Sequence, residues 1–162
     1  MKKDMQLNMR KIPLTQGKFA IVDDKDFDEL SKHKWYFDKY AIRTDYKNNR
    51  IYMMHRVIIN TPKGMDTDHV NGNKLDNRRN NLRVSNRSQN VANNGLRKNN
   101  TIGFKGVEFL KNRNFNKPWH ARLTLNYRCI SLGCFSTAIE AAQAYNRAAL
   151  KYFGEFARLN KI

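Results

Sequence analysis

An aspartate and a histidine stand side by side at positions 68 and 69, in a segment (residues 65–70) long enough for one short strand. Side chains of adjacent strand residues point to opposite faces, so the Asp68 carboxylate could hold a metal ion while the His69 imidazole faces a reacting water. Histidine suits proton transfer at neutral pH because its ordinary pKa is about 6.5. In isolation, a solvated polar strand end explains the pair more simply, so the surrounding residues decide its meaning.

Two asparagines follow at spacings that could complete a site. Asn81 comes twelve residues after His69, at the start of a short strand expected over residues 81–84, and Asn90 comes nine residues later. Ser85 is a suitable N-cap for a helix over about residues 86–93, which would carry Asn90. The expected order of elements is therefore strand, loop, strand and helix.

This layout resembles the HNH nucleases, particularly the homing-endonuclease branch. The matching segments are His55-Arg56-Val57-Ile58, Asp68-His69-Val70-Asn71-Gly72-Asn73, Leu75-Asp76-Asn77-Arg78, Asn81-Leu82-Arg83 and Ser88-Gln89-Asn90. The resemblance implies a ββα-metal core in which His69 takes a proton from water and Asn81 orients the loop and His69. It also implies one divalent cation per site, Mg²⁺ or Mn²⁺, held by Asp68 and Asn90. Hard oxygen ligands fit these ions better than zinc.

Some neighbouring residues leave alternatives open. Other asparagines close to Asn90 could take its place if the helix register differs from the expected one. His55 is as compatible with packing or a phosphate contact as with catalysis. We expect Asp66 and Asp76 to be solvated turn residues.

Basic side chains are concentrated around the two asparagines. Between positions 77 and 100 the chain has nine Asn, six Lys or Arg, and no acidic residue. Asparagine favours turns, so much of this stretch should be loop or extended chain. Lysine and arginine neutralise phosphates, and we therefore expect DNA contacts from Arg78, Arg79, Arg83, Arg87, Arg97 and Lys98.

Residues 102–162 show the pattern of a second folded unit. Apolar residues at 119, 121, 123 and 125 alternate with polar ones, which predicts a half-buried strand. Thr137 and Glu140 form a capping box, followed by a helical spacing of alanines and tyrosines up to Gly154. The expected structure is a three-stranded antiparallel sheet packed on one helix.

This unit resembles the AP2 DNA-binding domain. The matching residues are Phe104-Lys105-Gly106-Val107, Trp119-His120-Ala121, Leu132-Gly133-Cys134-Phe135, the stretch 137–149, and Gly154, Ala157, Leu159 and Asn160. The resemblance implies that the outer face of the sheet enters the major groove, with Lys105, Trp119, Arg122 and Arg128 as candidate contacts. Core packing is an equal alternative for Trp119, because it shares a face with apolar residues.

The elements that must position these side chains define the expected fold class, α+β. Residues 1–60 should form a β-rich segment of the nuclease unit, with short strands and a hairpin turn near position 48. Residues 61–98 should form the HNH ββα-metal core, and residues 99–162 the AP2-like domain. Residues 55–59 could extend a strand or begin a short helix, and residues 1–50 have no evident function.

The charge of the chain favours a nucleic acid as partner. Of the net charge of +17 on 162 residues, +4 falls on residues 1–76 and +13 on residues 77–162. Such self-repulsion is of use to a protein that binds phosphates and of none to an enzyme acting on a small neutral substrate. No apolar run approaches the roughly 18 residues of a membrane span, so we expect no membrane partner.

Together these features predict a metal-dependent DNA endonuclease of the HNH type, homing and nicking, that an AP2-like domain positions on double-stranded DNA. A monomer or weak dimer without an evident protein partner is expected, encoded by a phage or mobile element and active in the cytoplasm of a bacterial host. The alternatives are a DNA-binding regulator with an inactive nuclease fold and, less favoured, an RNA-binding protein.

Overall fold

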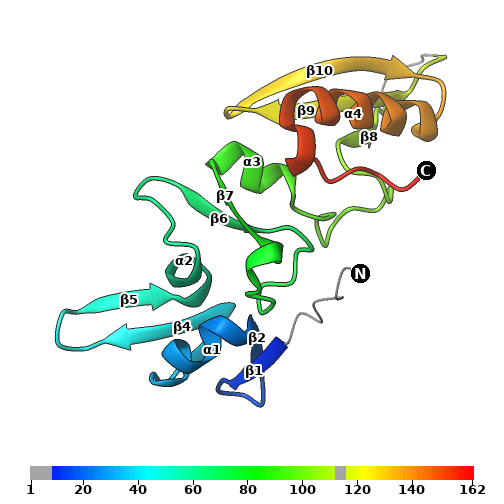
Figure 1. Ribbon diagram of the computed structural model, residues 1–162. Coiled ribbons are helices and arrows are strands. Elements are labelled where there is room, and N and C mark those ends of the chain that lie inside the picture. Colours follow the sequence, from blue (N-terminus) through cyan, green and yellow to red (C-terminus); the bar gives the residue numbers. More distant parts are fainter. Residues whose placement is uncertain (1–8, 112–115) are drawn as a thin grey trace, which may run out of the picture. The chain divides into compact units, whose positions relative to one another are not determined.

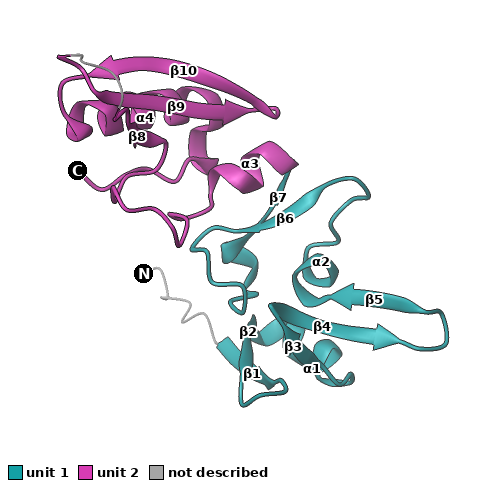
Figure 2. Cartoon of the chain, turned by 180° about the vertical axis from the view of Figure 1, so that it is seen from behind, with its two compact units in different colours: residues 1–86 teal, residues 87–162 magenta. Residues whose placement is uncertain are grey.

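The first half of the chain is built from short strands around one apolar cluster. The computed structural model describes residues 9–111 and 116–162 (Figure 1). It divides into two units, residues 1–86 and 87–162, which are coloured separately in Figure 2. Each unit is described by itself below.

In the described part of the first unit, each sheet joins strands that follow one another along the chain. Strands β1 (Met9–Pro13) and β2 (Phe19–Asp23) pair antiparallel, and helix α1 (Asp24–Ser31) follows directly. Strands β3 (Tyr36–Asp38), β4 (Tyr40–Asp45) and β5 (Arg50–Met53) form an antiparallel sheet in the order β3-β4-β5. The hairpin expected near position 48 is thereby confirmed, and residues 55–59, which were left open, lie in helix α2 (Met54–Ile58) and its C-cap.

The remaining elements of this unit form the hairpin that carries the aspartate–histidine pair. Strand β6 (Asp66–His69) pairs antiparallel with β7 (Leu82–Ser85), and a short 3₁₀ turn, η1 (Arg79–Asn81), precedes β7. The strand expected over residues 81–84 is thus found one residue later along the chain. A strand, a loop and a second strand occur in the predicted order.

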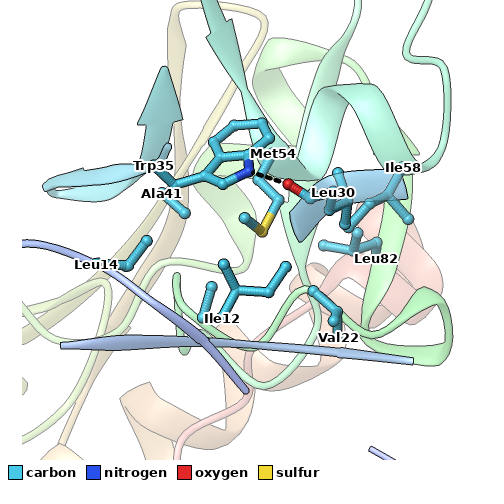
Figure 3. Close-up of a cluster of buried hydrophobic side chains, with 10 residues drawn as sticks. Ile12, Leu14, Val22, Leu30, Trp35, Ala41, Met54, Ile58 and Leu82 are labelled. Carbon is cyan, nitrogen blue, oxygen red and sulfur yellow. Dashed lines mark hydrogen bonds between the residues drawn. The ribbon is translucent and has the colours of Figure 1, made fainter. Parts of the chain in front are cut away.

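The core of the first unit joins elements from its whole length. Ile12, Val22, Leu30, Trp35, Met54 and Leu82 are among the buried side chains that form one cluster (Figure 3). The Trp35 indole Nε1 donates a hydrogen bond to the Leu30 carbonyl at 2.8 Å, which satisfies its polar atom inside the core. Burial of each large apolar side chain contributes about 1.5–3 kcal/mol. The N-terminal strands are therefore part of the scaffold that holds β7.

The N-terminal strands also fix the long loop between β6 and β7. The Ile21 backbone N–H donates to the Leu75 carbonyl at 2.8 Å, and the Asn77 N–H donates to the Ile21 carbonyl at 2.7 Å. These two bonds form an isolated parallel bridge between β2 and the loop at Asp76. Residues 1–50, to which the sequence assigned no function, thus include a strand that anchors the loop beside His69.

The second unit is an antiparallel sheet backed by a helix, as expected. Helix α3 (Arg87–Ala92) precedes strands β8 (Val107–Phe109), β9 (Trp119–Leu125) and β10 (Arg128–Phe135), which have the order β10-β9-β8. Helix α4 (Ala138–Phe153) follows, with the predicted capping box at Thr137 and Glu140, and then η2 (Gly154–Phe156). Asn126 and Tyr127 both have positive φ, 47° and 65°, as a tight two-residue hairpin turn requires.

Small side chains let α4 approach the sheet closely. Ala141, Ala142 and Ala144 pack against Val107 and Ala121, and all five side chains are buried. Packing is equally close at Gly106, where an added Cβ would overlap the Tyr145 ring and lie 2.6 Å from the Arg122 carbonyl oxygen. Among the described residues, no helix has the length and apolar character needed to cross a membrane.

Candidate functional site

The Asp68–His69 pair lies at the end of β6 and is almost inaccessible to solvent. Asp68 is 4% exposed and His69 5%, and their partners across the hairpin are Arg83 and Leu82. Arg83 Nε donates a hydrogen bond to Asp68 Oδ2 at 2.9 Å, and Nη2 forms an ion pair with the same oxygen at 2.8 Å. A buried carboxylate is costly without such a charge partner. Arg83, one of the residues expected to contact DNA, therefore stabilises Asp68 in this structure.

An amide side chain fixes which nitrogen of His69 is basic. Asn77 is fully buried, and its Nδ2 donates to the Leu75 carbonyl at 3.3 Å, which defines the orientation of the amide. The other end, Oδ1, then lies 3.3 Å from His69 Nε2 and can only accept a hydrogen bond. Nε2 therefore carries the proton of the neutral ring, and the lone pair is on Nδ1. This arrangement makes Nδ1 the basic nitrogen.

Two further rings surround His69. The His55 ring lies edge-on to it with centroids 5.1 Å apart, and the Tyr40 ring lies 4.9 Å from His55 and 6.2 Å from His69. Burial lowers the pKa of His55 to about 3, with smaller contributions from His69 and Arg56. Its Nδ1 is a buried atom that has no hydrogen-bond partner among the residues that the structure describes. His55 is therefore neutral at physiological pH. A neutral ring fits packing against its neighbours, whereas a phosphate contact through charge would require the protonated ring.

Burial also lowers the pKa of His69 below its ordinary value. The hydrogen bond with Asn77 and the carboxylates of Asp68 and Asp76 act in the opposite direction, and the Lys74 ammonium adds to the lowering. Since the net shift is downward, His69 is neutral at pH 7 and can accept a proton. The neutral form is the one that a general base needs.

Asn81 closes the loop that follows His69. Its Oδ1 accepts from the Asn71 N–H at 2.9 Å, and its Nδ2 donates to the Asp76 carbonyl at 2.7 Å. These bonds join the two ends of the loop next to β6. Asn81 thereby holds the loop, and its orienting role toward His69 stays a prediction.

Asp76 is not the solvated turn residue that the sequence suggested. It is 2% exposed, and Arg78 donates to both of its oxygens, through Nε at 2.8 Å and Nη2 at 2.7 Å. Asn71 Nδ2 adds a third bond at 2.8 Å. These hydrogen bonds, those of Arg78 first, hold the pKa of Asp76 below its ordinary value. The prediction was wrong because local turn composition gives no sign of a distant strand, β2, covering the loop.

The side chains around Asp68 fit a hard cation that takes most of its ligands from water and from a phosphate substrate. No cluster of three or more His, Cys, Asp or Glu side chains that could hold a metal exists in the described part of the chain. Asp68 supplies one carboxylate, and Arg83 occupies its Oδ2. One carboxylate with phosphate and water oxygens is the coordination typical of Mg²⁺ at a phosphate substrate, and it does not suit zinc. Asn90 lies on α3 in the second unit, and its role as a metal ligand stays a prediction.

Two of the other arginines expected to bind DNA are engaged in ion pairs within the first unit. Arg78 pairs with Asp76 as described, and Arg79 makes a two-bond pair with Asp26 of α1, at 2.8 Å for each bond. The Arg79 backbone N–H donates to the Asp23 carboxylate at 2.8 Å. These arginines hold the loop to the N-terminal elements, and DNA contact by them stays a prediction.

The candidate DNA contacts of the second unit lie in different environments. The Lys105 ammonium donates to the carbonyls of Ala92 and Asn94, the latter at 2.8 Å, and burial lowers its pKa to about 8. Trp119 packs on the buried face of the sheet and contacts the Phe109 ring, with centroids 4.9 Å apart. The structure therefore supports the core alternative for Trp119, and it gives Lys105 a structural role at the end of α3.

The outer face of the sheet carries a chain of polar side chains. Glu108 Oε1 lies 2.8 Å from His120 Nδ1, and His120 Nε2 lies 2.8 Å from the Ser131 hydroxyl. Arg122 pairs with the other Glu108 oxygen at 3.1 Å, so its charge is partly compensated. Six of the predicted contacts are exposed, namely Arg79, Arg87, Arg97, Lys98, Arg122 and Arg128, and of these Arg79 and Arg122 form the ion pairs already described.

Sequence reasoning missed two residues of the site. Asn77 lies in the matching segment Leu75-Asp76-Asn77-Arg78, but it is one of nine asparagines in its stretch and the resemblance gave it no role. Tyr40 lies 29 residues before His69 in the chain, and only the fold brings its ring to the site. Its position on an expected hairpin strand was available from the sequence, but its neighbours were not.

Comparisons with known proteins identify a family for the part of the chain that carries this site. The family model for HNH endonucleases matches residues 52–92, which span α2, β6, β7 and α3. A protein of Acanthamoeba polyphaga mimivirus, described as an uncharacterized HNH endonuclease, is 32% identical over 153 residues, covering 91% of this chain and 77% of the relative. No solved structure matches the chain. On the match to this relative, together with the Asp68–His69 hairpin, the chain belongs to the HNH endonuclease family.

Proposed function

We propose that the protein is a metal-dependent DNA endonuclease that hydrolyses phosphodiester bonds, with His69 as the general base. The observation that carries the proposal is the hydrogen bond between His69 Nε2 and Asn77 Oδ1, because it leaves the lone pair on Nδ1. Membership of the HNH endonuclease family supports the reaction class.

The reaction begins with a water molecule whose O–H donates to His69 Nδ1. The water oxygen attacks phosphorus in line with the leaving 3′ oxygen, its proton moves to Nδ1, and the bond to the 3′ oxygen breaks. During this step Asn77 continues to accept from Nε2–H, which holds the ring in one orientation. The carboxylates of Asp68 and Asp76 favour the imidazolium that forms, because both raise the pKa of His69.

Asp68 would hold a single Mg²⁺ or Mn²⁺, with Asn90 as the second ligand implied by the family resemblance. When bound, such an ion supplies a Lewis acid for the phosphate and charge stabilisation for the leaving oxygen. Arg83 holds the Asp68 carboxylate in place through a hydrogen bond from Nε and an ion pair from Nη2, both to Oδ2.

We further propose that the second unit is an AP2-like module that binds duplex DNA. The three-stranded sheet packed on α4 supports this proposal, as do the exposed cations Arg97, Lys98 and Arg128 and the net charge of +13 over residues 77–162. A homing role and an origin in a mobile element remain parts of the proposal, and the viral source of the relative favours such an origin. The bacterial host stays a prediction.

The test uses supercoiled plasmid carrying DNA from the gene's own neighbourhood, with Mg²⁺ present. The wild type should cleave it, chelator should abolish cleavage, and added Mg²⁺ should restore it. His69→Ala should lower the rate by about 10²–10⁴-fold, the usual contribution of a general base. His33→Ala is the matched control, because His33 is exposed and lies outside the site. Duplex binding without metal-dependent cleavage would instead identify an inactive regulator, and preferential binding to structured RNA would exclude both readings.

The order of products tests the oligomeric state. One site cuts one strand, so a monomer should give open-circular DNA before linear DNA. Direct conversion to the linear form would contradict nicking and require a dimer at the cleavage site.

A further inference from the structure

Two lysines gather over the ring that packs against the proposed base. The Lys39 ammonium lies 5.7 Å and the Lys74 ammonium 5.2 Å from the centroid of Tyr40. The same ring lies 6.2 Å from the His69 ring and is nearly parallel to it, at 26°. Lys39 belongs to the turn between β3 and β4, and Lys74 to the loop between β6 and β7. The fold therefore brings two cations from distant parts of the sequence to one side chain of the site.

The charge of this pair is not compensated by carboxylates. Partial burial lowers the pKa of Lys74, and the neighbouring Lys39 ammonium lowers it further. A carboxylate partner would have raised it. Among residues 9–111 and 116–162, neither lysine forms an ion pair, whereas Arg78, Arg79 and Arg83 are paired with Asp76, Asp26 and Asp68. The lysine pair is thus a concentration of unneutralised positive charge beside His69.

The backbone at Lys39 is in an unusual conformation. Its φ is +61°, in a turn so tight that Asp38 and Tyr40 pair across it. Left-handed backbone is unfavourable for a side chain other than glycine, and asparagine tolerates it better than lysine does. Lysine at this position therefore raises the energy of the folded chain while adding to the repulsion with Lys74. An anion bound between the ammonium groups would offset the repulsion between them.

We propose that Lys39 and Lys74 form a phosphate clamp, which holds a backbone phosphate of the DNA strand next to the bond attacked at His69. Two ammonium groups with rotatable donors match the oxygens of a phosphodiester. Tyr40 stacks on His69 and packs at a tilt against His55, which holds the clamp and the base at a fixed separation. The identity of the phosphate as DNA rests on the proposed function. The binding of phosphate itself does not.

The test measures duplex binding by metal-free protein, so that no cleavage is needed, over a series of salt concentrations. The variants are Lys74→Gln and Lys39→Asn, the second chosen because asparagine keeps the turn. Each lost phosphate contact lowers the slope of log K against log salt by about 0.9. The double variant should therefore lose about 1–2 units of slope and about tenfold or more in affinity at low salt. Lys25→Gln, an exposed lysine on α1, makes the same charge change as a control and should leave the slope unaltered.

The outcomes separate this proposal from the proposed function. A wild-type slope in the double variant overturns the clamp, even if the protein cleaves DNA. If the double variant has a reduced slope and the wild type fails to cleave DNA, the clamp is supported and the nuclease assignment is refuted. Competition by inorganic phosphate identifies the kind of anion: if millimolar phosphate displaces DNA from the wild type as weakly as from the double variant, the clamp does not bind free phosphate and requires the DNA strand.

Discussion

Replacing Asn77 by aspartate should change the pH at which the proposed base works. The substitution keeps the shape of the side chain and puts a negative charge where a neutral oxygen now lies 3.3 Å from His69 Nε2. The carboxylate stabilises the imidazolium form of His69 relative to the neutral ring. The variant therefore needs a higher pH than the wild type before its base is deprotonated.

The magnitude follows from the geometry. Two unit charges 3.3 Å apart interact by about 5 kcal/mol at an effective dielectric constant of 20. Desolvation of the new carboxylate, which enters a fully buried position, offsets several kcal/mol of this attraction. A net gain of about 1–2 kcal/mol remains, similar to the difference between a charge-assisted and a neutral hydrogen bond. This corresponds to a rise of about one pH unit in the acid limb of kcat.

The assay is a pH profile of cleavage under single-turnover conditions, together with NMR titration of the His69 ring in metal-free protein. Asn80→Asp is the matched control, because Asn80 is exposed in the neighbouring turn and adds the same charge. Its acid limb should move by a few tenths of a unit at most, since solvent screens the charge. If the Asn77→Asp protein is folded and both readouts coincide with the wild type, Asn77 does not hold the base, and the assignment of Nδ1 fails.

Two further predictions concern stability. Because the pKa of His55 is about 3 in the folded chain and about 6.5 when unfolded, the unfolded state binds the proton first. The contribution of this group to the free energy of unfolding is complete above pH 6.5 and should fall by about 1.4 kcal/mol per pH unit down to pH 3. Chemical denaturation at several pH values, with chelator present, measures this slope. In His55→Gln the slope should correspond to one proton fewer taken up on unfolding. Gly106→Ala should destabilise the second unit by about 2–5 kcal/mol, because strain at positive φ adds to overlap with Tyr145. Gly103→Ala, with positive φ but open space around it, should cost only the strain, and equal unfolding midpoints for the two would show that the overlap relaxes freely.

Much of the local structure was predictable from the sequence, because its signals are short-range. Alternation in β9, the capping box of α4 and the turn at Asn126 each depend on residues within a few positions of one another. The adjacency of Asp68 and His69 and the spacing to Asn81 likewise identified the central hairpin. Domain limits were harder: the structure places the division between units after Asn86, before the helix that the sequence grouped with the hairpin.

The predictions of DNA-contacting residues show the limit of composition. A run of arginines without acidic neighbours in the sequence suggested a free basic surface, yet Arg79 pairs with Asp26, which lies 53 positions earlier in the chain. Lys105 and Trp119 matched the positions of the resemblance, but burial and packing turned both toward the protein interior. Charge counts describe the whole chain, whereas ion pairs depend on which acids the fold brings near.

By itself, the sequence determined the pair that can do chemistry, the order of the elements that carry it, and the need for an anionic partner. These properties follow from residue types, spacing and net charge, which are fixed before the chain folds. The tertiary structure alone decided that Asn77 orients His69, that His55 and Tyr40 enclose it, and that Lys39 and Lys74 meet beside it. The physical reason is that hydrogen bonds, burial and charge interactions act over a few ångströms in space, between residues that the sequence separates by up to 35 positions.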